Sequence, residues 1–236
     1  MNALDSTILS SINQFSRVSQ TVDYTIIFLA GNHFLKGGLL ASLLWWGWYR
    51  SHENQPYVRE HVISTLLSCL VAIVLAKTLT LTLPFRLRPI HEAGVDFLLP
   101  YGAVSTALEG WSSFPSDHAV LFYALSTGLL FVSRRAGIFA LVYTTLVISL
   151  PRIYLGLHYP TDIIGGAVVG MLVGWLGNTA VMRAKIARPI VGWSNTMPGF
   201  FYPVFFLITY QIADTFKNSR AILEFIRDIF QGFPVQ

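Results

Sequence analysis

The chain has 236 residues, of which 53% are hydrophobic and 12% are charged, with a net charge of +4 and a mean hydropathy of +0.56. Soluble domains carry about 25% charged residues and disordered chains need low hydrophobicity, so the composition excludes disorder and argues against a soluble domain. A transmembrane helix takes about 20 residues, which leaves room for six helices and their loops. We therefore predict an all-α, polytopic integral membrane protein with a single membrane domain over residues 1–236.

The first twenty residues are too polar to span a membrane. Apolar side chains recur there at helical spacing, with Asp5 and several serines between them. This pattern predicts an amphipathic helix over residues 1–20 that lies in the membrane interface, and a similar pattern predicts a second one over residues 219–233. The segment lacks the basic start and cleavage site of a signal peptide, so we expect all 236 residues to be mature.

Six charge-poor apolar stretches predict six transmembrane helices. The first has residues 37–49 as its core and can extend back toward Tyr24. The next four are residues 62–84, 119–133, 136–151 and 163–182, and residues 190–213 contain the sixth. The fifth stretch contains small residues that permit close helix packing, namely Gly165, Gly166, Gly170 and Gly174. Cys69 is the single cysteine, which excludes an intramolecular disulfide and a multi-cysteine metal site.

Basic residues predict the orientation of these spans. The loops after the first, third and fifth spans carry seven lysines and arginines, against three in the loops after the second and fourth. The positive-inside rule therefore places the first group in the cytoplasm and the loop after the second span outside. The longest basic run is Arg134-Arg135, so the charge is a topology signal and does not indicate nucleic-acid binding.

Polar residues suited to chemistry gather on the expected outer side. The long loop over residues 84–114 contains Arg86 and Arg88, and Pro115-Ser116-Asp117-His118 follows directly before the third span. Arg152 ends the fourth span, and His158 to Asp162 open the fifth. Connections of that length are uncommon in compact domains and usually functional.

The spacing of these residues predicts a phosphate site. His158 and Asp162 are four apart, so an Asp162 carboxylate can accept the imidazole N–H and leave the other ring nitrogen free as a nucleophile. Ser116 and His118 lie at a helix start, where free N–H groups bind anions. Arg88 and Arg152 add forked donors that match phosphate oxygens. One histidine can attack phosphorus while the other protonates the leaving oxygen.

The same residues resemble the three-part signature of the type 2 phosphatidic acid phosphatase family. The parts are Arg88-Pro89, then Pro115-Ser116-Asp117-His118, then Arg152 followed by His158 and Asp162 at the family's spacing, all within residues 77–166. The six-span layout is similar to the family's as well.

The resemblance implies a role for each residue. His158 would attack phosphorus and form a phosphohistidine, with Asp162 orienting it and His118 protonating the leaving group. Ser116, Arg88 and Arg152 would hold the phosphate oxygens, and no metal or other cofactor would be required.

Two departures from the family pattern concern the first and third parts. The family's first lysine would fall at Leu81, which cannot carry a charge. Lys77, one helical turn earlier on roughly the same face, can reach toward the site, and Arg86 is a second substitute. Pro151 replaces the serine that usually precedes the third-part arginine.

The sequence thus predicts a metal-independent phosphatase of a lipid phosphate or diphosphate at the outer face of a bacterial inner membrane. Undecaprenyl diphosphate is the favoured substrate, because Pro-Ser-Asp-His resembles the diphosphatase branch. Phosphatidylglycerophosphate, phosphatidate and lipid A are the alternatives. A transporter, a lipid-binding scaffold and a metal site of His118, His158 and Asp162 are weaker readings, since the charges lie at one membrane face and arginines would repel a cation.

Overall fold

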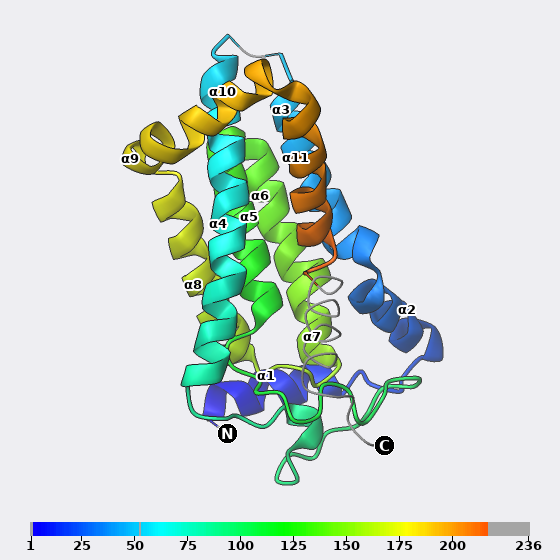
Figure 1. Cartoon of the computed structure of the whole chain (residues 1–236). Helices are drawn as coiled ribbons and strands as arrows, with labels where there is room; N and C mark the ends of the chain where they lie inside the picture. The colour runs from blue at the N-terminus through cyan, green and yellow to red at the C-terminus, as the bar shows by residue number, and fades with distance from the viewer. Residues whose placement is uncertain (1, 52, 217–236) are drawn as a thin grey trace, which may run out of the picture.

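The computed structural model describes residues 2–51 and 53–216, and every regular element within them is helical (Figure 1). The expected helix over 219–233 lies outside the described residues. The elements, in chain order, are α1 (Ala3–Asn13), α2 (Gln20–Gly31), η1 (Phe34–Gly38), α3 (Leu39–Tyr49), α4 (Gln55–Thr82), η2 (Pro89–His91), α5 (Asp117–Val132), α6 (Arg134–Tyr143), η3 (Thr144–Ser149), α7 (Leu150–Tyr154), α8 (Pro160–Gly177), α9 (Ala180–Met182), η4 (Arg183–Ala187), α10 (Arg188–Thr196) and α11 (Pro198–Ala213).

Helix length and apolarity give three candidate membrane spans among these residues, or four with a bent pair. The three are Gln55–Thr82, Arg134–Tyr154 and Pro160–Gly177, and the pair is Gln20–Gly31 with Phe34–Tyr49, bent by 61°. α5 and α11 are apolar but have only 16 residues each. At 1.5 Å per residue each is about 24 Å long, short of the roughly 30 Å hydrocarbon core. The all-helical membrane fold is confirmed, and the count of six spans stays a prediction.

The glycines of α8 allow the backbones of α5 and α8 to approach closely, as the sequence predicts. A Cβ on Gly170 would lie 2.3 Å from the Val120 carbonyl oxygen, and one on Gly174 would lie 2.6 Å from that of Ala124. Ala72 and Ala76 of α4 fill the space beside them. This tight three-helix core holds the N-terminal ends of α5 and α8 next to one another.

The two ends of the bundle differ in character (Figure 1). The α3–α4, α5–α6 and α8–α10 connections lie at one end, and these carry the seven basic residues of the orientation argument. α1 and the long loop over residues 83–116 lie at the other end, where α5 and α8 begin. The basic loops and the residues suited to chemistry are therefore separated by the length of the bundle.

α1 lies within the helix predicted over residues 1–20, and its buried face carries polar side chains as well as an apolar one. It lies across the end of the bundle in Figure 1 and buries Asp5, Leu9 and Asn13 on one face, with Asp5 fully inaccessible. Leu4 and Phe15 are about half exposed. Asp5 points inward because it accepts hydrogen bonds from Arg86 of the long loop and Thr161 of α8.

Candidate active site

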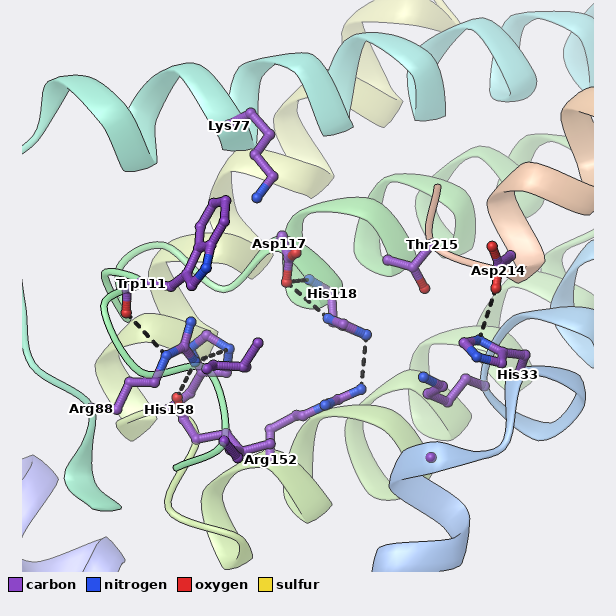
Figure 2. Close-up of a pocket in the computed structure, with 15 residues that line it drawn as sticks. His33, Lys77, Arg88, Trp111, Asp117, His118, Arg152, His158, Asp214 and Thr215 are labelled. Atoms are coloured by element: carbon purple, nitrogen blue, oxygen red, sulfur yellow. Dashed lines mark hydrogen bonds and ion pairs between the residues drawn. The ribbon is translucent and has the colours of Figure 1, made fainter. Parts of the chain in front are cut away.

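A cavity of about 470 Å³ lies at the end of the bundle where α5 and α8 begin (Figure 2). It is lined by side chains of the α2–η1 bend, α4, the long loop, α5, α7 and the turn before α8, and by the two residues after α11. Of the residues singled out by the sequence, Lys77, Arg88, His118, Arg152 and His158 all reach this one chamber. The structure thus brings together side chains spread over more than eighty positions of the chain.

His158 is oriented as a neutral imidazole with its Nε2 lone pair in the chamber. Its Nδ1 lies 2.8 Å from the carbonyl oxygen of Ser113, which can only accept, so Nδ1 carries the proton. Its Nε2 lies 3.3 Å from Nη1 of Arg88, a donor. Burial is the main cause that lowers the pKa of His158, and the Arg88 charge acts in the same direction. Nε2 therefore carries the lone pair and is the ring nitrogen able to act as a nucleophile.

The acceptor for His158 differs from the one that the spacing predicts. The Asp162 carboxylate lies 3.7 Å from Nδ1, beyond hydrogen-bond distance, and Ser113 takes the bond instead. Asp162 accepts from the backbone N–H of Tyr159 at 2.7 Å, which closes the first turn of α8. Its carboxylate therefore fixes the turn that carries His158 and raises the pKa of that imidazole, opposing burial.

Arg88 is held by the backbone on both sides of the chamber. It donates to the carbonyls of Trp111 at 3.1 Å, Ser112 at 3.1 Å and Leu157 at 2.5 Å. These acceptors are neutral, so they orient the guanidinium without cancelling its charge. Burial lowers the pKa of Arg88, yet at neutral pH the group remains a cation beside the nucleophile.

His118 forms the second histidine–arginine pair. Its Nδ1 lies 2.8 Å from the Asp117 carboxylate, and its Nε2 lies 2.8 Å from Nη2 of Arg152. Arginine can only donate, so Nε2 of His118 accepts here and Nδ1 carries the proton. Arg152 also donates to the Ala30 carbonyl at 3.2 Å, and its Nε has no hydrogen-bond partner among the described residues. Figure 2 shows this pair between His158 and the His33 side of the chamber.

The first-part lysine is best matched by Lys77. Its ammonium lies 4.4 Å from the centre of the Trp111 ring, and both side chains line the chamber. Arg86, the other candidate, is held elsewhere by the carboxylates of Asp5 and Asp162, each at 2.6 Å. Lys77 of α4 therefore lines the chamber, whereas Arg86 belongs to an ion-pair network with Asp5 and Asp162.

Ser116 is fully buried and caps α5. Its hydroxyl accepts from the Ala119 N–H at 3.4 Å, and its own N–H donates to the Asp162 carbonyl at 3.2 Å. These contacts join the starts of α5 and α8. Ser116 is not among the residues that line the chamber in this structure, so its contact with phosphate stays a prediction.

The network behind the nucleophile was not foreseen from the sequence. Asp5 accepts from Arg86, from the Thr161 hydroxyl at 2.7 Å and from the Thr161 N–H at 2.9 Å. Arg86 also donates to the Asp162 carboxylate, and its Cζ lies over the Tyr159 ring, 4.1 Å from the ring centre. α1 is thereby fastened to the turn that holds His158, although Asp5 is 156 positions from Thr161.

Other residues of the chamber were missed or given lesser roles by the sequence. Asp117 partners His118, and Lys36, to which the sequence assigned no role in the site, lines the cavity at 5% exposure. A lysine inside an apolar segment is itself a signal of function, and that signal was available at Lys36 as much as at Lys77.

The chamber can bind an anion and attack it. Among the described residues, four lysine and arginine side chains line it against two carboxylates, so it favours a multiply charged anion. Two Nε2 atoms, each beside an arginine, provide a nucleophile and a proton carrier. No group of three or more His, Cys, Asp or Glu side chains arranged to hold a metal ion occurs in the described part of the chain.

Comparison with known families agrees with this geometry. The PAP2 superfamily profile matches residues 57–186, more than half of the chain and all of the sequence motifs from Lys77 to Asp162. The chain belongs to the PAP2 superfamily. It is thus a phosphatase of phosphoric esters with lipid-phosphatase relatives.

The relatives of this PAP2 protein include enzymes named for several lipids. Undecaprenyl-diphosphatase BcrC of Bacillus subtilis is 29% identical over 169 residues, covering 72% of this chain and 80% of that protein. Putative undecaprenyl-diphosphatase YbjG of Escherichia coli is 26% identical, covering 78% and 89%. The lipid A 4'-phosphatase of Bacteroides thetaiotaomicron is 39% identical, covering 39% and 40%.

A solved structure shares the fold of this PAP2 protein. LpxE of Aquifex aeolicus superposes with a TM-score of 0.50 at 22% identity, covering 75% of this chain and 95% of the other. At that identity the match supports the helical architecture alone.

Proposed function

We propose that this PAP2 phosphatase removes the terminal phosphate of undecaprenyl diphosphate, without a metal ion, through a phosphohistidine on His158. The observation that carries the proposal is the pair of neutral imidazoles whose Nε2 atoms lie beside buried arginines in one chamber. Arg88, Arg152 and Lys77 supply the positive charge that phosphoryl transfer needs. Ser116 contributes by holding the start of α5 against α8.

The first step forms a bond between His158 Nε2 and the terminal phosphorus. Incoming phosphoryl oxygens draw Arg88 from His158 and Arg152 from His118, which frees both Nε2 atoms. The bond between phosphorus and the bridging oxygen breaks, and its electron pair goes to the departing lipid phosphate. With Arg152 turned to the substrate, His118 takes a proton at Nε2 from the monoprotonated phosphate that enters the chamber and gives it to that oxygen, with Asp117 balancing the transient imidazolium charge.

The second step returns the enzyme to its starting state. Water attacks the phosphohistidine phosphorus while His118, now neutral, takes its proton and passes it to the phosphate that leaves the chamber. The phosphorus–nitrogen bond breaks, and its electron pair goes back to His158 Nε2. The Ser113 carbonyl keeps the proton on Nδ1 throughout, so the same nitrogen serves in every turnover.

The substrate choice rests on the relatives and on the charge of the chamber. Two relatives that cover most of this chain are named for undecaprenyl diphosphate. A chamber with two more lysines and arginines than carboxylates suits a diphosphate. Lipid A is the second candidate, because the relative with 39% identity, though over a shorter stretch, is named for it.

The membrane arrangement is part of the same proposal. Six spans, with α5 and α11 among them, would leave the chamber on the outer, periplasmic face of an inner membrane. The gathering of basic loops at the opposite end of the bundle supports this orientation.

The test is phosphate release by purified protein in detergent with EDTA. Undecaprenyl diphosphate, phosphatidate, phosphatidylglycerophosphate and lipid A are compared side by side. We expect the highest kcat/KM on the diphosphate, and no turnover by His158→Ala with an unchanged elution profile. Preferred release from a glycerolipid would contradict the substrate, whereas wild-type rates in His158→Ala would contradict the mechanism. Loss of activity in EDTA that a divalent ion restores would contradict the metal-free chemistry.

A further inference from the structure

One end of the chamber is built by residues that the catalytic scheme does not use. His33 and Lys36 come from the α2–η1 bend, and Asp214 and Thr215 follow α11. All four lie outside residues 57–186, the part of the chain that matches the superfamily. In Figure 2, His33, Asp214 and Thr215 lie on the side of His118 that faces away from His158.

Two features of this end indicate that it binds a ligand. Lys36 is 5% exposed, and its positive charge is near enough to act on His118. A buried lysine within an apolar segment is costly and marks function. Thr215 is 2% exposed, and its hydroxyl has no hydrogen-bond partner among the described residues. A buried hydroxyl without a partner costs free energy that a ligand oxygen can recover.

We propose that Lys36 and Thr215 form a second phosphate subsite, which holds the phosphate that stays on the lipid while His158 takes the terminal one. This inference rests on the proposed function and names the feature that makes the chamber prefer diphosphates to monophosphates.

The chemistry of the transfer places the second phosphate at this end. In an in-line displacement the leaving oxygen lies opposite the attacking nitrogen. His118 is the proton donor to that oxygen, so the leaving group lies on the His118 side of the phosphorus, toward Lys36. When the bridging bond breaks, the departing lipid phosphate gains negative charge, which the Lys36 ammonium stabilises. The leaving group of a monophosphate is an alcohol and offers Lys36 no second phosphate.

Asp214 is the one carboxylate at this end among residues 2–51 and 53–216. Its Oδ1 lies 3.3 Å from Nδ1 of His33. Lys36 is the lysine of η1 that lines this end of the chamber, and it is the residue that the test removes.

The first experiment compares two substrates with the same tail, farnesyl diphosphate and farnesyl monophosphate. For Lys36→Met we expect kcat/KM to fall at least tenfold on the diphosphate and less than about twofold on the monophosphate. Thr215→Val should show the same selectivity with a smaller loss. Lys185→Met, which removes an exposed lysine of η4, is the matched control and should change neither rate.

The second experiment measures binding without turnover. Calorimetry of His158→Ala with inorganic pyrophosphate and with inorganic phosphate should give about tenfold tighter binding of pyrophosphate, and Lys36→Met in that background should abolish the difference.

The outcomes separate the subsite from the phosphatase. An equal loss on both farnesyl substrates, or pyrophosphate binding that Lys36→Met leaves unchanged, would overturn the subsite and leave the phosphatase intact. If the wild type hydrolysed farnesyl monophosphate and not farnesyl diphosphate, the subsite would likewise be overturned and the phosphatase activity would stand. Wild-type turnover by His158→Ala would overturn the mechanism, and the pyrophosphate comparison would still decide the subsite.

Discussion

Replacing Asp5 tests whether the first helix takes part in catalysis. Asp5 is fully buried and holds Arg86 at 2.6 Å, and through it Asp162, which closes the turn that carries His158. Asp5→Asn keeps the size of the side chain but removes its charge. Breaking a buried ion pair by changing one partner costs about 3–5 kcal/mol. Because the Arg86 side chain is 29% exposed and keeps Asp162, we expect a loss of about 2 kcal/mol here.

Thermal unfolding and steady-state kinetics in detergent give the two readouts. A loss of that size lowers Tm by about 4–8 °C in a chain of this length. We expect kcat to fall about tenfold with KM within about twofold, because a small displacement of His158 affects the reacting geometry more than binding. Asp96→Asn, an exposed carboxylate of the same long loop, is the control and should change neither quantity.

A double-mutant cycle decides between positioning and simple support. Asp5→Asn combined with Arg86→Met should cost less than the sum of the two single changes, because each removes the partner of the other. Additive losses would refute the coupling between Asp5 and Arg86. A lower Tm with unchanged kcat would show that α1 only stabilises the fold.

Two further predictions concern the histidines. Burial and the Arg88 charge hold the pKa of His158 below its ordinary value of 6.5, so the neutral imidazole persists to lower pH. The acid limb of the kcat/KM profile that belongs to His158 should therefore lie below pH 6.5. A limb at or above pH 6.5 would contradict this environment. His118→Gln should lower the rate of hydrolysis by about a hundredfold for farnesyl monophosphate and by about tenfold for farnesyl diphosphate. The leaving group of the monophosphate is an alkoxide, which needs a proton more than a phosphate leaving group does. Equal losses on both substrates would contradict the role of His118 as proton donor.

The sequence by itself predicted the helical membrane fold and selected the candidate reacting groups. Apolar stretches of span length require helices, because the backbone must satisfy its own hydrogen bonds in lipid. Arg88, His118, Arg152 and His158 could be selected because they sit at helix starts and ends with fixed local spacing. These features depend on neighbours in the chain, so they are readable without a structure.

Tertiary packing decided which groups touch. Local spacing pairs His158 with Asp162, yet the Ser113 carbonyl is the nearer acceptor, and Arg86 is drawn from the phosphate site to Asp5, 81 positions away. Lys36 lines the chamber because the chain bends by 61° between α2 and the helix over Phe34–Tyr49, and Thr215 lines it because α11 ends there. Distances between remote segments depend on how helices pack, which no local pattern encodes.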